Sequence, residues 1–194
     1  ALKMDGVEGF LSILDRFTSE PERQEEFGAK VYKISYDSKG SRLTHMKIMG
    51  GELRMRDELA YTNADGESVR GKISSLRYYS GEKFRTAETA SAGEVCAVTG
   101  LVGTYAGQGI GCIRNSDRAV LEPVMTYRAL LPENINVHDA LKDMRRLEDE
   151  DPQLHIVWNE QLREIHVQLM GEVQLEVLQR LVRDRFGLEV SFGQ

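Results

Sequence analysis

The sequence has 194 residues, of which 41% are hydrophobic and 29% are charged, and its net charge is −6. These proportions are ordinary for a folded protein and exclude a disordered, collagen-like or disulfide-dense chain. No run reaches the roughly 18 apolar residues of a membrane span, and no signal peptide stands at the N-terminus, so we expect a cytoplasmic protein without a membrane partner. At about 150 residues per domain, the length predicts one large domain or two small ones.

The first predicted element is a short helix followed by a linker. Apolar residues recur at helical spacing at Val7, Phe10, Leu11, Leu14 and Phe17. The next residues, 18–26, are polar and contain Pro21, which is typical of a connection. We therefore assign residues 1–26 to a helix and a linker.

Short β-type runs separated by glycines begin at Phe27. They cover residues 29–36, 42–50, 52–61, 69–79 and 94–101. A parallel sheet would need helical crossovers, which this stretch lacks, so we expect antiparallel strands. The sequence predicts an antiparallel β-barrel over residues 27–121.

The C-terminal part of the chain alternates strands and helices. Asn136 is placed to cap a first helix, and alternating runs at 154–158 and 164–169 predict two half-buried strands. A second helix follows Gly171, and a short strand follows that helix. The order βαββαβ predicts a ferredoxin-like α+β domain over residues 122–194.

Charge is distributed unevenly along the chain. Residues 1–121 carry 17 basic and 17 acidic side chains, whereas residues 122–194 carry 8 and 14. Residues 30–85 hold 12 Lys and Arg against 7 Asp and Glu, a local excess that could contact a phosphate backbone. Salt-bridged surface strands would give the same count, so both interpretations stay open.

Three features could carry chemistry, and each has a simpler structural explanation. The glycine-rich run TGLVGTYAGQGIG at 99–111 lacks the GxxxxGK[ST] pattern of a phosphate-binding loop, which favours barrel turns. The acidic run at 148–151 lacks the spacing of a calcium loop, which favours a solvated turn. His155 and His166 lie in neighbouring predicted strands without a third ligand, which favours surface histidines over a metal pair.

The two cysteines give no further candidate site. Cys96 and Cys112 form no CxxC pair and have no clustered histidine, which favours free thiols over a zinc site or a disulfide. The residues thus predict no catalytic residue, no metal site and no cofactor in this chain.

Several long runs, in a fixed order, carry a family resemblance. They are FGAKVYKISYDSKGSRLTHMKIMGGELRMRDEL, KISSL at 72–76 and AGEVCAVTGL at 92–101, then LEPVMTYRALLP, DALKDMRRLEDEDPQL and QLMGEVQLEVLQRLVRDRFGLEVSFG. The first three resemble the second domain of translational GTPases of the elongation factor G family, and the last three resemble its third domain. The resemblance spans about residues 7–194.

The sequence near the end of the chain resembles one branch of that family most. A G-x-V-Q-x-E variant, carried by Gly171, Val173, Gln174 and Glu176, is similar to that of tetracycline ribosomal-protection proteins. Three positions depart from the family pattern: Gly50-Gly51 replaces Ser-Gly, and Arg56-Asp57 and Gly107-Gln108 each replace Gly-Asp. A fragment of an elongation factor G-type translocase therefore remains an alternative.

The resemblance implies a role in the middle of a longer GTPase, with GTP and Mg²⁺ held by a GTPase domain outside this chain. It implies that the barrel docks on ribosomal RNA of the small subunit, and that the ferredoxin-like domain sits near a small-subunit protein and relays the nucleotide state. We predict RNA contacts at Arg42, Arg54, Arg56 and Lys72. By resemblance, we predict an interdomain relay at Gly171, Glu172 and Gln174.

Two alternatives stay open at this point. Gly171 could have a structural role only: it could supply a backbone conformation, or allow a close approach of neighbouring atoms, that a side chain would block. The whole chain could also be a protein-interaction module without RNA contact. We expect a monomer whose partners are the ribosome and the remaining domains of the parent protein.

Overall fold

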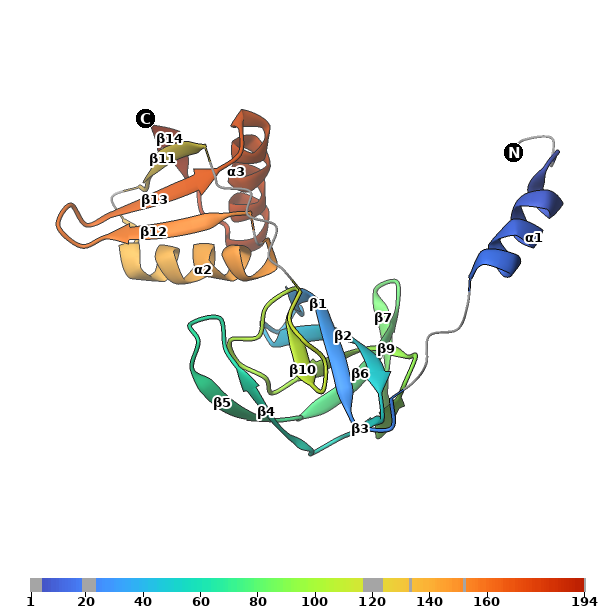
Figure 1. The fold of residues 1–194 in the computed structure, drawn as a ribbon. Coiled ribbons are helices and arrows are strands. Elements are labelled where there is room, and N and C mark those ends of the chain that lie inside the picture. Colours follow the sequence, from blue (N-terminus) through green and yellow to red (C-terminus); the bar gives the residue numbers. More distant parts are fainter. Residues whose placement is uncertain (1–4, 19–23, 117–123, 133, 152, 194) are drawn as a thin grey trace.

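A computed structural model describes residues 5–18, 24–116, 124–132, 134–151 and 153–193 (Figure 1). A helix, α1 (Val7–Phe17), precedes two compact groups of elements. We call the first group, strands β1 to β10, the β module, and the second group, β11 to β14 with α2 and α3, the α+β module. The predicted boundary at 121 and 122 and most of the predicted linker lie outside the described residues, so the domain limits stay predictions.

The β module consists of antiparallel strands around one core. Its largest sheet has six strands in the order β10-β1-β2-β9-β6-β7, and two ribbons, β3-β8 and β4-β5, stand beside it. The bounds are β1 Gly28–Tyr36, β2 Arg42–Gly50, β3 Glu52–Arg54, β4 Glu58–Thr62, β5 Ser68–Lys72, β6 Ser75–Ser80, β7 Lys83–Ala87, β8 Thr89–Ser91, β9 Val95–Thr99 and β10 Gly109–Gly111.

The predicted mainly β class is confirmed, but hydrogen-bonded ladders do not close a barrel within the described residues. The six-stranded sheet ends at β10 and β7, and each ribbon pairs only with itself. Two predicted strands are each split in two. A turn at Arg56, with a φ of 76°, separates β3 from β4, and Ile73 separates β5 from β6. These two breaks face each other, because the amide of Arg56 donates to the Ile73 carbonyl at 2.9 Å.

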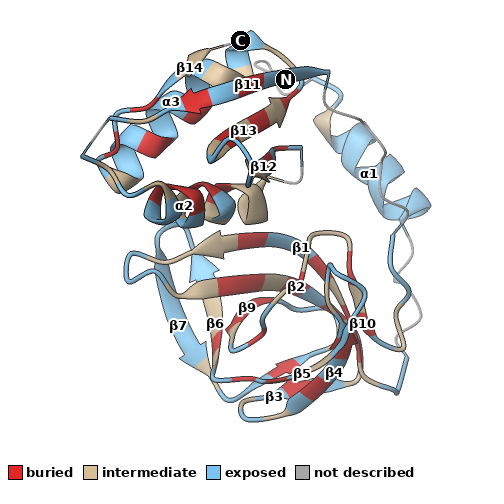
Figure 2. Ribbon diagram, turned by 90° about the vertical axis from the view of Figure 1, so that its left-hand side faces the viewer, coloured by how far each residue is buried: buried red, intermediate tan, exposed pale blue. Residues whose placement is uncertain are grey.

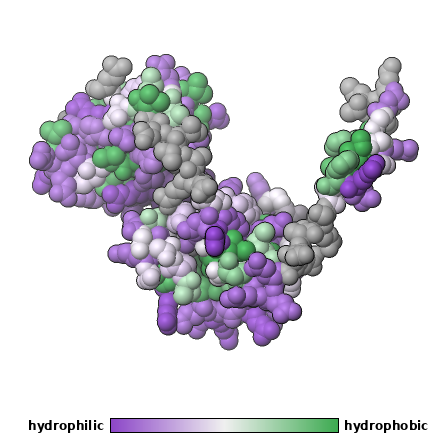
Figure 3. All heavy atoms as spheres, viewed as in Figure 1, coloured by the Kyte–Doolittle hydropathy of each residue, from purple (hydrophilic) through white to green (hydrophobic). Residues whose placement is uncertain are grey.

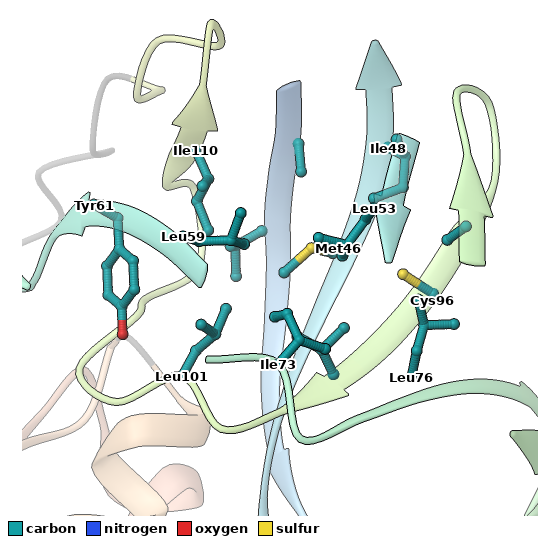
Figure 4. Close-up of a cluster of buried hydrophobic side chains, with 14 of the residues drawn as sticks. Met46, Ile48, Leu53, Leu59, Tyr61, Ile73, Leu76, Cys96, Leu101 and Ile110 are labelled. Carbon is teal, nitrogen blue, oxygen red and sulfur yellow. The ribbon is translucent and has the colours of Figure 1, made fainter. Parts of the chain in front are cut away.

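The apolar faces of these strands meet in a single core (Figure 4). Its largest fully buried members are Ile34, Met46, Ile48, Leu53, Ile73, Leu76, Leu101 and Ile110. The glycine-rich run at 99–111 supplies turns around this core between β9 and β10, as predicted, but its last three residues form β10. Gly100, for example, has a φ of 103°, and a Cβ there would collide with the carbonyl oxygen of Lys72.

The α+β module has the predicted βαββαβ order. Its elements are β11 Met125–Leu130, α2 Val137–Glu150, β12 His155–Asn159, β13 Glu164–Leu169, α3 Glu172–Phe186 and β14 Ser191–Gly193. The sheet order is β12-β13-β11-β14, all antiparallel. The predicted cap of α2 is confirmed, because Asn136 Oδ1 accepts from the His138 amide at 2.9 Å. Both helices share one core with alternate strand residues, so they cover one face of a ferredoxin-like sheet.

Helix α1 has the predicted bounds but takes no part in either core. None of its residues is buried, and its apolar side is uncovered (Figure 3). The exposed apolar residues are Phe10, Leu11, Ile13, Leu14 and Phe17. Across the described ranges, no helix combines the length and the apolar character that a membrane crossing requires.

Candidate functional site: the joint between the two modules

The two modules meet where α2 lies over the ends of β1 and β2 (Figure 2). The β module contributes Tyr36, the last residue of β1, and Arg42, the first residue of β2. The α+β module contributes Asp149 and Glu150 from the last turn of α2. We call these four residues the joint.

Arg42 connects the joint to the interior of the β module. Its Nε donates to Asp149 Oδ2 at 2.8 Å, while Nη1 donates to Thr104 Oγ1 at 2.7 Å and Nη2 to the Thr104 carbonyl at 2.5 Å. The Arg42 side chain is only 14% exposed. Its guanidinium is therefore occupied by protein acceptors on both sides, and the predicted RNA contact at Arg42 would have to compete with them.

Tyr36 binds both carboxylates of α2. Its amide donates to Glu150 Oε1 at 3.1 Å, and its hydroxyl donates to Asp149 Oδ2 at 2.7 Å. Burial and the hydrogen bond to Asp149 raise the pKa of the Tyr36 hydroxyl to about 12. The hydroxyl therefore remains a donor at any physiological pH.

Two arginines of the α+β module stand beside the joint. Arg185 Nη1 donates to Glu150 Oε2 at 2.6 Å, and the Arg146 guanidinium lies 4.6 Å from the centre of the Tyr36 ring. Together with Phe186 and the β1–β2 turn at 37–40, these arginines line a cavity of about 460 Å³. The joint thus combines ion pairs, hydrogen bonds and a cation–π contact.

The acidic run at 148–151 belongs to the candidate site, although the sequence did not predict it there. The predicted solvated turn is wrong, because all four carboxylates have protein partners: Glu148 accepts from the Ile156 amide at 3.0 Å, and Asp151 accepts from Gln174 at 3.3 Å. A signal was present in the sequence. Acidic side chains are unfavourable at the negative end of a helix dipole, and the last turn of α2 holds no basic residue, so the charge had to be compensated from elsewhere.

The predicted relay residues lie at the start of α3, next to the end of α2. The Gln174 side chain accepts from the Met170 amide at 2.9 Å and donates to Asp151, the residue that caps α2. Glu172 is exposed. Gly171 has an extended φ of 177°, and a Cβ there would meet nothing within 4 Å, so the explanation by backbone conformation or close approach is wrong.

The other predicted RNA contacts lie together and are exposed. Arg54 ends β3, Arg56 occupies the following turn, and Lys72 ends β5. The side chain of Arg54 is 67% exposed and has only a surface ion pair with Glu52 at 3.2 Å. We call these three residues the exposed basic cluster.

His155 and His166, in neighbouring strands of the α+β module, lie as surface residues. His155 is exposed, and His166 is half-buried, with its Nε2 3.1 Å from Glu164 Oε2. Hydrogen bonds to Arg128 and His166 lower the pKa of the Glu164 carboxyl. Among the described residues, no group of three or more His, Cys, Asp or Glu side chains could hold a metal ion.

Comparisons with known proteins agree with the fold and with the runs of sequence quoted above. Residues 121–194 match the family model for Elongation Factor G, domain III. The tetracycline resistance protein TetP of Clostridium perfringens is 24% identical over 172 residues, which cover 88% of this chain and 26% of TetP. Elongation factor G of Amoebophilus asiaticus is 28% identical over 180 residues, or 90% of this chain and 25% of that factor.

A solved structure supports the same conclusion for the fold. A protein from Thermus thermophilus superimposes with a TM-score of 0.67 and 22% identity, over 97% of this chain and 29% of its own. The predicted resemblance to the elongation factor G family is thus confirmed, and the relatives include both elongation factors and a tetracycline resistance protein. The chain spans about a quarter of the length of these curated relatives.

Proposed function

We propose that this chain forms the ribosome-binding middle part of a translational GTPase of the elongation factor G kind. In this proposal the β module docks on ribosomal RNA of the small subunit, and the α+β module contacts a small-subunit protein. The observation that carries the proposal is the match of residues 121–194 to domain III of elongation factor G, in a chain whose preceding module has the predicted β fold.

The exposure of basic side chains supports an RNA contact by the β module. Its exposed basic cluster, Arg54, Arg56 and Lys72, is open to solvent, which a phosphate contact requires. In the α+β module, the acidic end of α2 is occupied by Arg42, Arg185 and Tyr36. The acidic groups closest to the β module are therefore paired, so they add little repulsion toward a polyanion.

The joint supports the proposed relay. Gln174 at the start of α3 bonds Asp151, which directly follows the two carboxylates that hold Tyr36 and Arg42. A displacement of α3 would thus pull on the end of α2 and on the β module through a short chain of hydrogen bonds.

We place nucleotide chemistry outside these 194 residues. The sequence contains no phosphate-binding loop, and the curated relatives are about four times as long as the matched region. The chain alone should therefore bind neither GTP nor Mg²⁺ and should hydrolyse no GTP. Isothermal titration with GTP and Mg²⁺ tests this, and micromolar affinity would contradict it.

Ribosome binding is tested by sedimentation with purified 30S and 50S subunits over a range of salt concentrations. We expect saturable binding to 30S subunits that weakens as salt rises, because phosphate contacts release counterions. Binding that ignores salt would favour a protein-interaction module instead. A ribosomal partner would place the activity in the cytoplasm.

The similarity to TetP supports a second candidate within the same class, ribosomal protection against tetracycline. Experiments on the parent protein distinguish the two roles. A protection protein should raise the tetracycline concentration that its host tolerates, whereas a translocase should support translation when the host's own elongation factor G is depleted.

A further inference from the structure

The six-stranded sheet carries charge of one sign. Its strands contain seven Lys or Arg residues and no Asp or Glu: Lys30, Lys33, Arg42, Lys47, Arg77, Lys83 and Arg85. The neighbouring ribbons do contain acid, at Glu52 in β3 and Glu58 in β4. The bias is therefore a property of this one sheet.

The outer face of the sheet holds several of these cations. Along β2, Met46 and Ile48 are buried in the core, whereas His45 and Lys47 alternate with them and point outward. Lys33 pairs with His45 in the register, and Lys30 pairs with Lys47. Basic side chains therefore lie side by side across β1 and β2.

Aromatic rings continue across the same face from β1 to β7. Tyr32 lies 6.0 Å from His45, His45 lies 5.8 Å from Tyr79, and Tyr79 lies 5.3 Å from Phe84, measured between ring centres. The small residue Ala97 stands between β2 and β6 in the register and lets the rings approach across β9. We call Tyr32, His45, Tyr79 and Phe84 the aromatic row.

The row is accessible and is flanked by a fixed cation. Tyr32 is 49% exposed, Tyr79 is 37% exposed and Phe84 is 48% exposed. The Arg77 guanidinium lies 4.5 Å from the centre of the Phe84 ring and is held by Asp37 at 3.0 Å. Burial and Lys33 lower the pKa of His45, which favours its neutral ring.

We propose that the outer face of this sheet binds single-stranded RNA, with unpaired bases stacked on the aromatic row and phosphates beside Lys33 and Lys47. This proposal rests on the proposed ribosomal function and adds a second RNA-binding surface to the exposed basic cluster. Exposed rings interleaved with cations are the chemistry by which proteins hold unpaired bases, since rings stack on bases and cations contact the backbone. A protein partner could use the rings, but a sheet without a single acid matches a polyanion better.

The proposal is tested with the whole chain and a fluorescein-labelled ten-nucleotide RNA of mixed sequence that contains 2-aminopurine. Fluorescence anisotropy measures affinity, and the 2-aminopurine emission reports stacking. The test variant is Tyr32→Leu with Tyr79→Leu, which removes two rings without changing charge. The matched control is Phe10→Leu with Phe17→Leu, which removes two exposed rings from α1.

We expect the wild type and the α1 control to bind the single strand and to quench 2-aminopurine. The Tyr32→Leu, Tyr79→Leu variant should bind about tenfold more weakly for each stack lost. Substituting Lys33→Gln and Lys47→Gln should lower the salt slope of log K by about 1.4. If the double variant is poorly folded by circular dichroism, Phe84→Leu at the sheet edge replaces it, again with about tenfold weaker binding expected.

Three results would overturn the proposal: no binding of the single strand, equal binding of a matched RNA duplex, or a change of less than twofold when the rings are removed. Sedimentation with 30S subunits is measured in parallel with the same variants. Wild-type binding to 30S subunits together with any of these three results would overturn the single-strand surface and leave the proposed function standing. Failure of the wild type to bind 30S subunits would overturn the proposed function itself.

Discussion

Arg42 begins β2 and Arg54 ends β3, the next strand along the chain, and the sequence presents them alike. Each is a basic residue at a polar position of the same basic stretch. In the structure the Arg42 side chain is 14% exposed and bonds Asp149 and Thr104, whereas the Arg54 side chain is 67% exposed. A local excess of basic residues therefore contains both groups available to a partner and groups committed to the fold.

The difference depends on what lies opposite each residue in space. Arg42 faces the acidic end of a helix that is more than 100 positions away in the sequence, whereas Arg54 faces solvent and Glu52. Removing Arg42 should therefore damage the joint, and removing the exposed basic cluster should damage only binding to a partner.

The largest effect is expected at the exposed basic cluster. The variant Arg54→Gln, Arg56→Gln, Lys72→Gln should bind 30S subunits more weakly and should lower the salt slope of log K by about 2 to 3, since each lost phosphate contact removes about 0.7 to 0.9. Sedimentation at four or more salt concentrations measures the slope. An unchanged slope would show that the phosphate contacts lie elsewhere on the chain.

The next effect is expected at the joint. Arg42→Met should destabilise the chain by about 2 kcal/mol, because it leaves the buried Thr104 carbonyl without its donor and removes the ion pair with Asp149. Urea unfolding followed by circular dichroism measures the loss. Arg54→Met is the matched control and should leave the unfolding midpoint unchanged. Equal midpoints for the two variants would contradict the contrast between them.

A smaller difference is expected within the relay residues. Gln174→Ala should cost about 1 kcal/mol of unfolding free energy, because it removes the bonds to Met170 and Asp151. Glu172→Ala should cost less than about 0.5 kcal/mol, as is typical of an exposed position. In the full-length parent both should lower ribosome-stimulated GTP turnover. Normal turnover by both variants would leave Gln174 with a structural role only.

The smallest effect is expected at Arg56, and it has the opposite sign. Arg56 has a φ of 76° where the family pattern has glycine, so its side chain makes the turn strained. Arg56→Gly should raise stability by about 0.5 kcal/mol. Relief of the backbone strain stabilises the folded chain by more than the added conformational entropy of glycine stabilises the unfolded chain. Thermal unfolding measures the shift. A lower melting temperature would show that the arginine side chain stabilises the turn.

Much of the fold follows from local patterns in the sequence. The bounds of α1, the cap at Asn136 and the βαββαβ order all depend on spacing within a few residues, and the structure has them. The strands that were missed, β7, β8 and β10, are short, and β7 has no buried face that would give it an alternating pattern. The breaks at Arg56 and Ile73 depend on pairing across the module, which periodicity does not report.

The candidate site was harder to predict than the fold. Arg42, Tyr36 and Asp149 meet only after two modules have folded and docked, and no local spacing connects them. The unfavourable charge at the end of α2 was the one available signal. It indicated that these carboxylates have partners, but it did not identify the partner residues. The aromatic row is likewise spread over β1, β2, β6 and β7 and becomes visible only through the strand order.

Competition with elongation factor G for ribosomes tests the central claim most directly. The purified chain is added to elongation factor G, GTP and ribosomes, and the ribosome-stimulated release of phosphate is measured at several concentrations of each protein. If the chain is the ribosome-binding middle part of a related GTPase, it should inhibit competitively, and the variant Arg54→Gln, Arg56→Gln, Lys72→Gln should inhibit more weakly. Unchanged turnover at chain concentrations far above those of the factor would contradict the account.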